Sequence, residues 1–384
     1  MNILHISPYY PTLNAMHAGG VVMGKEIETL KQMGHTVYSL SFVQKKYDLD
    51  LYKKEKNEKT EGVVIDNIRK LQNILCHILT PAFFGSRIDK RFKNIIESYI
   101  LKYNIDAIHA EYAAMLYYAD IKKKYPNIKF NIVLHDVTIQ SYERKYTSER
   151  NVFKRICLRF EKWRIERFEK KYLEKCDQII TFSDKDKVLV KKYYGFESNV
   201  INTYFRLERI EKMREVYKRE KSDEFSMFFL GQMGRIENHE AALRLIRIFK
   251  ELNIENKHLY IVGANPSTEL TRYQCDNITI TGFVEDVESY LLKKCDMACF
   301  PLNKGAGVKI KVLEALTLGF PVVTNVIGAE GIDENEKFIF LADDDKSFID
   351  MIYYVYKSSY TANFCEMDEQ FSWKKTENVF RHIY

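Results

Sequence analysis

The sequence predicts an α/β protein with two domains, each built on a parallel sheet. Short apolar segments of strand length alternate with segments of helical periodicity along the whole chain. The 384 residues exceed the usual size of one domain, and 46 % of them are apolar, which is enough to fill two cores. The stretch 206–223 is strongly charged and poor in apolar residues. We therefore place the boundary there, with domains at 1–205 and 206–369 and a final segment, 370–384.

Composition disfavours several classes of protein. The formal charge of +6 is a mild excess, which suits phosphorylated substrates or an anionic membrane surface and does not indicate a nucleic-acid partner. Seven scattered cysteines without CxxC pairs predict a reducing cytoplasm, no disulfide framework and no zinc site. No apolar run approaches the roughly 18 residues of a membrane helix. The start, MNILHISPYY, lacks a basic region, so we expect no signal peptide.

The first domain is predicted to open with a strand over Asn2–Ser7 and a long loop that ends at Gly19 and Gly20. A helical pattern follows, Gly34 ends it, and His35–Val43 reads as the second strand. A loop of this length at the carboxyl end of a first strand is often functional. The spacing of the glycines in this loop differs from that of the dinucleotide-binding motif GxGxxG, which disfavours a Rossmann dehydrogenase.

Residues 44–105 are rich in lysine and show helical patterns, most clearly over Asn73–Leu79 and Phe92–Leu101. A basic amphipathic surface of this kind can lie on acidic lipid headgroups, and a solvated helix face is the alternative. Strands are predicted at Ile105–Ala110 and Phe130–His135. A long basic helix, 151–176, and another strand follow.

His135 and Asp136 stand at the end of the apolar run NIVL. Ligands of open α/β proteins bind at the carboxyl edge of the sheet, and an imidazole there can hydrogen-bond to a sugar hydroxyl or a phosphate. We expect Asp136 to orient this group or to contact an acceptor. The alternative is a structural histidine, which is also what we expect of His5.

The second domain is predicted to begin with a strand over Phe225–Leu230 and the turn Gly231–Arg235. We expect Asn238 to cap the helix that follows. The Arg235 guanidinium at this helix entry has the shape for bidentate contact with a phosphate, and a merely exposed arginine is the alternative. The segment Ile278–Phe283 is a further predicted strand.

The stretch from Gly305 to Thr324, GAGVKIKVLEALTLGFPVVT, predicts a glycine loop, a helix from about Lys309 to Leu318 and a strand. Lys309 and Lys311 fall at the helix start, which already carries a partial positive charge. Two ammonium groups and exposed amides there suit a phosphate. One turn later, Glu314 could accept hydrogen bonds from a ribose; the alternative is a solvated face with an ion pair.

These features resemble the retaining glycosyltransferases of family 4. The family pattern is a glycine-rich loop, a basic residue, Glu-Ala, two or three residues, Gly-x and Pro-Val-Val, and the stretch above matches it. Two glutamates lie eight apart in much of the family; Glu314 matches the second, and Ala306 stands where the first would be. Arg235 matches an arginine that grips the diphosphate, but the lysine that usually follows it is absent.

The resemblance implies roles for particular residues. Catalytic roles would fall to His135, Arg235 and Lys309, and an acceptor contact to Asp136. The donor would be bound by Gly19, Gly20, Gly282, Phe283, Val284, Gly305, Ala306, Gly307, Val308, Lys311 and Glu314. Phe283 could equally belong to the core. No metal ligand is expected, because no DxD-like pair stands out beyond the predicted surface turn 343–345.

The resemblance also implies the GT-B fold, two facing Rossmann-like domains with a C-terminal helix that crosses back to the first, anchored by Trp373 and Phe380. The activity would be hexosyl transfer from a nucleotide diphosphate sugar to a sugar, glycan or lipid-linked acceptor, with retention and without a cofactor. Bacterial surface polysaccharide is the family's commonest product, made in the cytoplasm or on the inner membrane face. A nucleotide-sugar epimerase and a non-catalytic partner subunit remain alternatives.

Overall fold

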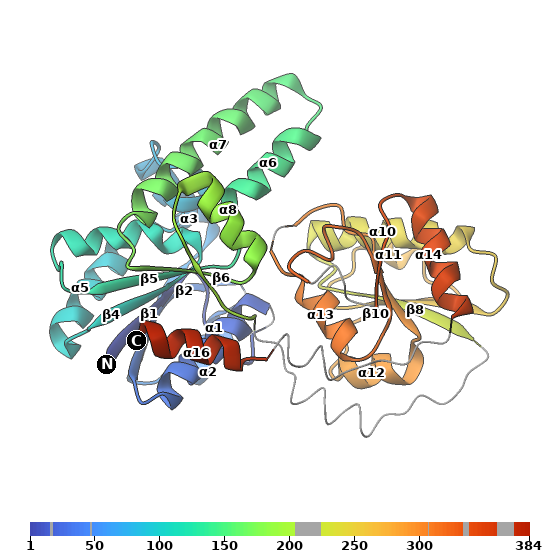
Figure 1. Cartoon of the computed structure of the whole chain (residues 1–384), viewed down its shortest axis with the longest axis horizontal. Coiled ribbons are helices and arrows are strands. Elements are labelled where there is room, and N and C mark those ends of the chain that lie inside the picture. Colours follow the sequence, from blue (N-terminus) through green and yellow to red (C-terminus); the bar gives the residue numbers. More distant parts are fainter. Residues whose placement is uncertain (16–17, 47, 204–223, 306, 333–337, 359–371) are drawn as a thin grey trace. The chain divides into compact units, whose positions relative to one another are not determined.

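The computed structural model describes residues 1–384 except 16–17, 47, 204–223, 306, 333–337 and 359–371 (Figure 1). The chain divides into two compact units. The first comprises Met1–Tyr204 with Trp373–Tyr384, and the second comprises Phe205–Ser372. The expected boundaries at 205/206 and 369/370 lie outside the described residues. The predicted fold class, α/β with two parallel-sheet units, is confirmed.

The first unit contains a seven-stranded parallel sheet in the order β3-β2-β1-β4-β5-β6-β7. Its strands are β1 (Asn2–Ser7), β2 (Thr36–Gln44), β3 (Thr60–Ile65), β4 (Ala107–Glu111), β5 (Lys129–Leu134), β6 (Gln178–Thr181) and β7 (Asn199–Val200). Its helices are α1 (Ala18–Gln32), α2 (Leu49–Glu55), α3 (Asn67–Cys76), α4 (Ala82–Gly85), α5 (Lys90–Tyr103), the 3₁₀ segment η1 (Ala113–Lys123), α6 (Thr138–Ser148), α7 (Val152–Leu173), α8 (Asp184–Tyr194) and α16 (Lys374–Ile383).

Helix α5 shows how local sequence sets these elements. The Asp89 side chain accepts a hydrogen bond from the Arg91 amide and caps the first turn. Phe92 and Ile96 are fully buried on one face, and Asn104, at φ 48°, ends the helix in the left-handed conformation. The helix predicted over Phe92–Leu101 is thus confirmed. Strand β3 was not predicted, because it is a short edge strand within a lysine-rich segment.

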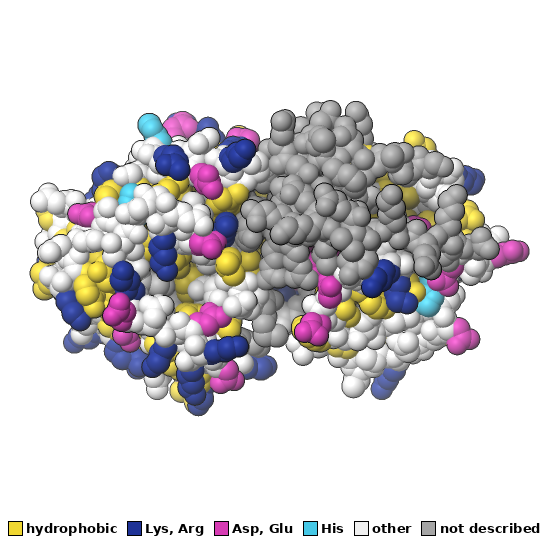
Figure 2. Space-filling view, turned by 90° about the horizontal axis from the view of Figure 1, so that it is seen from below, with side chains coloured by type: hydrophobic (Ala, Val, Ile, Leu, Met, Phe, Trp, Pro, Cys, Tyr) yellow, Lys and Arg dark blue, Asp and Glu magenta, His cyan; other side chains and the backbone are white. Residues whose placement is uncertain are grey.

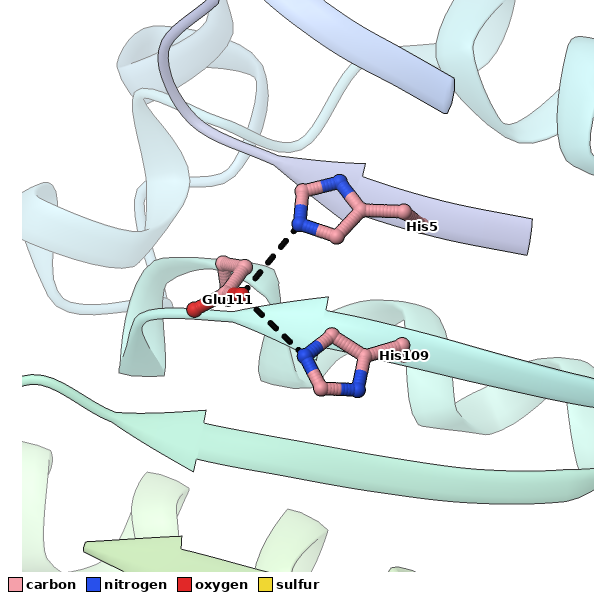
Figure 3. A group of neighbouring side chains, drawn as sticks. All are labelled: His5, His109 and Glu111. Carbon is pink, nitrogen blue, oxygen red and sulfur yellow. Dashed lines mark hydrogen bonds and ion pairs between the residues drawn. The ribbon is translucent and has the colours of Figure 1, made fainter. Parts of the chain in front are cut away.

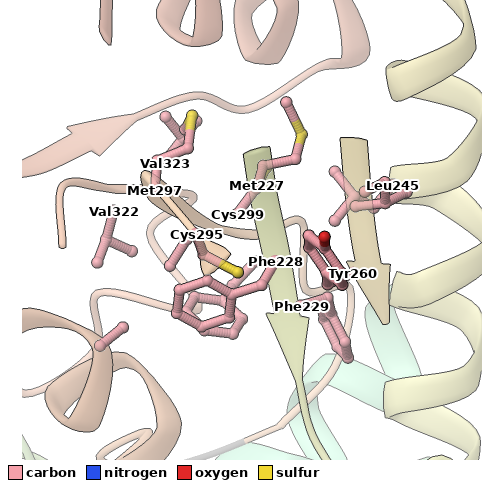
Figure 4. Close-up of a cluster of buried hydrophobic side chains, with 14 of the residues drawn as sticks. Met227, Phe228, Phe229, Leu245, Tyr260, Cys295, Met297, Cys299, Val322 and Val323 are labelled. Atoms are coloured by element: carbon pink, nitrogen blue, oxygen red, sulfur yellow. The ribbon is translucent and has the colours of Figure 1, made fainter. Parts of the chain in front are cut away.

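The second unit contains a six-stranded parallel sheet in the order β10-β9-β8-β11-β12-β13. Its strands are β8 (Phe225–Leu230), β9 (Lys257–Val262), β10 (Ile278–Gly282), β11 (Met297–Phe300), β12 (Val322–Thr324) and β13 (Ile339–Leu341). Its helices are α10 (Ile236–Glu251), α11 (Thr268–Thr271), α12 (Val287–Lys294), α13 (Ile310–Thr317) and α14 (Asp345–Lys357). Figure 4 shows its core, where Phe228 and Phe229 of β8 lie near Met297 and Cys299 of β11 and Val323 of β12.

The C-terminal helix α16 belongs to the first unit, as the resemblance implied. Phe380 is fully buried, and Trp373 Nε1 donates a hydrogen bond to Thr29 Oγ1 of α1 at 2.8 Å. Figure 1 shows α16 beside α1. The last residue, Tyr384, hydrogen-bonds through its hydroxyl to His109 Nδ1 of β4 at 2.6 Å.

Helices α6 and α7 form a hairpin that extends beyond the sheet of the first unit (Figure 1). Several large apolar side chains of α7 are exposed, among them Phe153 and Phe160. On the face of the first unit seen in Figure 2, Lys and Arg side chains are interspersed with Asp and Glu. None of the described helices combines the length and the apolar character that a membrane span requires.

Replacing Phe380 by alanine should destabilise the first unit by about 3–5 kcal/mol, because a fully buried aromatic ring would leave a cavity. Both tryptophans of the chain, Trp163 and Trp373, lie in this unit, so denaturant unfolding followed by tryptophan fluorescence reports on it. Leu79, with 92 % of its surface exposed, provides the control: Leu79→Ala should change the unfolding free energy by less than about 0.5 kcal/mol. Equal losses in the two variants would contradict the packing described for α16.

Candidate active site

Both sheets have a point at which the strand order reverses. In the first unit β1 lies between β2 and β4, and in the second β8 lies between β9 and β11. Connections on the two sides of such a strand leave in opposite directions, so a crevice forms outside the carboxyl ends, where open α/β proteins bind ligands. Most of the predicted site residues follow strands next to these two points.

In the second unit, the loops after β8 and β9 touch through their backbones. A β-carbon on Gly263, which has φ 143°, would lie 1.8 Å from the Gly231 carbonyl oxygen. The Met233 amide also donates to the Ala264 carbonyl at 2.8 Å. Only glycine allows this approach, and it fixes the backbone that leads into α10.

Helix α10 begins at Ile236 with Arg235 as its N-cap residue, so the prediction that Asn238 is the cap was wrong. Asn238 lies in the first turn instead, buried, with its Nδ2 donating to the Gln232 carbonyl at 2.9 Å. The Arg235 side chain is 61 % exposed and forms an ion pair with Glu237. It therefore remains in reach of a ligand at the start of this helix.

Lys311 extends from α13 toward α10. Its Nζ donates to Asn238 Oδ1 at 2.5 Å and lies 4.7 Å from the ring centroid of Phe229. Burial, followed by the positive charge of Arg235, lowers the pKa of Lys311 to about 8. The largely buried ammonium of Lys311 thus has one amide oxygen and the rings of Phe229 and Phe300 as neighbours, so a nearby anion would stabilise it.

Lys309 is the N-cap residue of α13, which begins at Ile310. Its Nζ donates to the Gly307 carbonyl and pairs with Glu330 Oε2 at 3.2 Å; the Glu330 side chain is only 2 % exposed. The side chain of Lys309 is thus fixed by contacts within the protein. Gly305 and Gly307 have positive φ values of 127° and 71°, as the predicted glycine loop requires.

The remaining predicted donor residues of the second unit surround the same edge of the sheet. Ala306 lies outside the described residues, Val308 packs against the core, and Glu314 is partly buried on α13. Gly282 has φ 68°, and Val284 packs against the core. Phe283 is 73 % exposed, so the alternative that it belongs to the core was wrong. Its ring is available for stacking.

In the first unit, His135 follows β5 and precedes Asp136, as predicted. Its ring stacks on Tyr112 with centroids 3.6 Å apart, and its Nε2 is hydrogen-bonded to Glu111 Oε2 at 2.8 Å. Gly19 and Gly20 do not end the preceding loop: α1 begins at Ala18, so both lie in its first turn. Their backbone amides are therefore at the positive end of that helix.

Glu111 also belongs to a group of buried polar side chains, of which Figure 3 shows His5, His109 and Glu111 on neighbouring strands. Glu111 Oε1 lies 3.2 Å from His5 Nε2 and 3.1 Å from His109 Nε2, and Glu26 Oε2 lies 2.9 Å from the same His109 nitrogen. Burial, followed by the neighbouring Glu26, raises the pKa of Glu111. Burial alone would lower the pKa of His109, but Tyr384 and Glu26 raise it to about 9.

His5, His109 and Glu111 have the composition of a metal site, and their approaching atoms lie within 4.8 Å of one another. Each of these atoms already has a hydrogen-bond partner within the group. Glu26, 2.9 Å from His109, also raises the pKa of this histidine, which favours an ion pair between the two side chains. We therefore assign the three residues to a hydrogen-bonded network.

Sequence reasoning missed His109 and Glu111 and treated His5 only as structural. One signal was available: His109 and Glu111 are two apart on a strand, so they share a face. The register that pairs His5 with His109 on adjacent strands was not available. Glu330, which binds Lys309 from 21 positions further along the chain, gave no pattern at all.

Three comparisons with known proteins bear on this geometry. Residues 224–358 match the family model described as "Glycosyl transferases group 1". No curated protein sequence matches the chain. Among solved structures, sucrose-phosphate synthase from Thermosynechococcus elongatus superposes with a TM-score of 0.72 at 15 % identity, over 100 % of this chain and 98 % of that one.

Two further structures are similar over the whole chain. The lipopolysaccharide outer core galactosyltransferase WaaB, in its apo form, has a TM-score of 0.68 at 10 % identity, with 100 % of both chains covered. HepE from Anabaena, in complex with UDP, has a TM-score of 0.65 at 14 % identity, over 100 % of this chain and 99 % of that one. These likenesses confirm the GT-B fold.

The depressed pKa of Lys311 predicts a pH dependence of stability. Burial disfavours the charged amine, so keeping Lys311 protonated in the folded state lowers the free energy of unfolding. This loss of stability is fully present below about pH 8 and disappears as the pH rises toward 10.5, the ordinary pKa of lysine. Lys311→Met removes the penalty, and its stability gain relative to wild type should shrink by about 3 kcal/mol between pH 7 and pH 10.5. Scanning calorimetry of both proteins checks this; a difference that stays constant with pH would contradict it.

Proposed function

We propose that this chain, whose residues 224–358 match the family model of the group 1 glycosyl transferases and whose fold is GT-B, transfers a sugar from a nucleotide diphosphate sugar to an acceptor hydroxyl. The proposed reaction is hexosyl transfer with retention of configuration, and it uses neither a metal ion nor an organic cofactor. The donor diphosphate would bind at the carboxyl edge of the second unit's sheet.

The observation that carries this proposal is the concentration of positive charge at the start of α13. The helix amides, the positive-φ backbone at Gly305 and Gly307, and the buried Lys311 meet near the exposed Arg235. A leaving nucleotide gains negative charge in the transition state, and preorganised donors of this kind stabilise such charge. Lys309 would contribute to diphosphate binding indirectly, because its hydrogen bond to the Gly307 carbonyl fixes the glycine loop. The UDP in the HepE complex supports this ligand class.

The other substrate contacts follow from the same assignment. Glu314, one turn into α13, would accept hydrogen bonds from the ribose, and the exposed Phe283 ring would lie against the nucleobase, flanked by the backbone of Gly282 and Val284. His135 would contact the transferred sugar and Asp136 the acceptor. The amides of Gly19 and Gly20 at the start of α1 would meet the donor phosphate and sugar.

A non-catalytic partner subunit is the second candidate. One observation favours it: Ala306 replaces the first family glutamate, and both lysines of the donor segment are already bonded within the protein. Sugar transfer with any donor discards this candidate. An epimerase would need further acids and bases near the sugar, and the acidic groups beside His135 are the fully buried Glu111 and the partly exposed Asp136.

We also propose that the acceptor is lipid-linked, as in bacterial surface polysaccharide assembly, and that the first unit binds an anionic membrane surface from the cytoplasmic side. Exposed apolar side chains gather on α7 and on the neighbouring segment 78–83. They are Ile78, Leu79, Phe83, Val152, Phe153, Ile156, Phe160 and Trp163. The two segments are joined by a hydrogen bond from Arg164 to the Ile78 carbonyl. The exposed Lys154, Arg155 and Arg159 complement acidic headgroups.

Glu314→Ala tests the donor site. Loss of hydrogen bonds between a carboxylate and a ribose should weaken binding of the nucleotide diphosphate about tenfold or more, measured as a smaller ligand-induced rise in melting temperature. The exposed Glu251 of α10 provides the matched control, since Glu251→Ala should leave the rise unchanged. Unaltered affinity in Glu314→Ala would remove the ribose role, and loss of transfer on chelation would contradict the metal-free mechanism.

The membrane proposal predicts that Phe153→Ser with Phe160→Ser weakens binding to phosphatidylglycerol vesicles at least tenfold, since each buried ring contributes roughly 1.5–3 kcal/mol. Vesicle co-sedimentation measures this. Val188→Ser, at an equally exposed apolar side chain of α8, should bind as wild type does. Wild-type binding that is absent, or equal on phosphatidylcholine, would overturn the proposal.

A further inference from the structure

We propose that Glu111 is a positioning residue for sugar transfer, which holds the imidazole of His135 at the carboxyl end of β5. This inference rests on the proposed function, because it takes His135 as the group that meets the sugar. It adds a buried residue that need not touch substrate, and it assigns a purpose to the polar network of the first unit.

The His135 ring is held on three sides. Its Nε2 is bonded to Glu111 Oε2 at 2.8 Å, one face stacks on Tyr112 at an interplanar angle of 12°, and Phe182 approaches edge-on with centroids 4.8 Å apart. The side chain keeps 9 % exposure. Of these three neighbours, only the carboxylate distinguishes the two ring orientations related by a 180° turn about the Cβ–Cγ bond, because an aromatic face or edge has no directional acceptor.

Backbone strain at Tyr112 supports a functional purpose for this arrangement. Tyr112 follows β4 with φ 66° and ψ 146°, a combination that residues with a β-carbon rarely adopt. Such a conformation costs on the order of 1–3 kcal/mol and persists where the surrounding structure imposes it, most often at functional sites. Here it places the tyrosine ring flat on His135, directly after Glu111 in the chain.

Glu111 is in turn held from within the unit. Its other oxygen, Oε1, meets His5 and His109, and His109 is hydrogen-bonded to Glu26 of α1 and to the hydroxyl of Tyr384, which follows α16. Glu111, His5, His109 and Glu26 are all 0 % exposed. The carboxylate therefore cannot swing toward water, and α1, β1, β4 and α16 jointly fix the position from which it holds His135.

Steady-state kinetics of the full chain test the role. Glu111→Ala should lower kcat about 10- to 100-fold and leave the KM for donor within about twofold, since most of the proposed donor contacts are made by residues of the second unit. Glu111→Gln keeps a carbonyl oxygen at the same place and should recover part of kcat. Tyr384→Phe removes the hydroxyl that is hydrogen-bonded to His109, a neighbour of Glu111, and should lower kcat by a smaller factor.

A merely structural role would lower the melting temperature without changing kcat per folded molecule. Asp89→Asn is the matched control: Asp89 is also a buried carboxylate of the first unit, bonded to Arg69 and Arg91. The Asp89→Asn variant should have a lower melting temperature than wild type and an unchanged kcat. If Glu111→Ala does not fold, the Gln variant decides: kcat equal to wild type in Glu111→Gln and Tyr384→Phe together overturns the inference.

The outcomes separate the inference from the proposed function. Normal transfer by wild type with unchanged kcat in Glu111→Ala overturns only the positioning role. No transfer by wild type with any donor overturns the proposed function, and the inference falls with it. Elemental analysis of the purified protein should find less than one tenth of a metal ion per chain. A stoichiometric ion that is lost in His109→Ala would make Glu111 a metal ligand and overturn its assignment as the holder of His135.

Discussion

The order of the parallel strands is the constraint on which both candidate sites depend. Strand β1 pairs with β2 on one side and β4 on the other, and β8 pairs likewise with β9 and β11. Each reversal leaves loops and helix starts around one stretch of sheet edge. In the second unit the contact between Gly231 and Gly263 brings the loops together, and in the first the pairing of His5 with His109 assembles the polar network.

The two edges carry different chemistry. The second unit gathers positive charge, from Arg235, Lys311 and the start of α13, and a buried ammonium such as Lys311 is costly until an anion shares its surroundings. The first unit buries carboxylates and imidazoles next to the partly exposed His135. In the proposed transfer, the second unit would bind the diphosphate anion and the first unit would position the histidine that contacts the sugar.

Features that depend on a few consecutive residues could be predicted from the sequence. The glycine loop before α13 and the helix itself followed from φ requirements and periodicity. The start of α1 was missed because glycines at 19 and 20 are expected in a loop, yet their amides fit the first helical turn. Contacts fixed by strand register or by distant loops, such as Glu111 with His5 or Lys309 with Glu330, have no signature in one sequence.

The central claim is that a diphosphate is bound by the second unit at the start of α13. Calorimetric titration of the full chain with uridine, guanosine and adenosine diphosphates, each beside its monophosphate, tests it most directly. The account predicts that at least one diphosphate binds ten times more tightly than its monophosphate, and that Arg235→Ala abolishes this difference while Glu111→Gln preserves it. Equal binding of mono- and diphosphates, or a difference that survives Arg235→Ala unchanged, would contradict it.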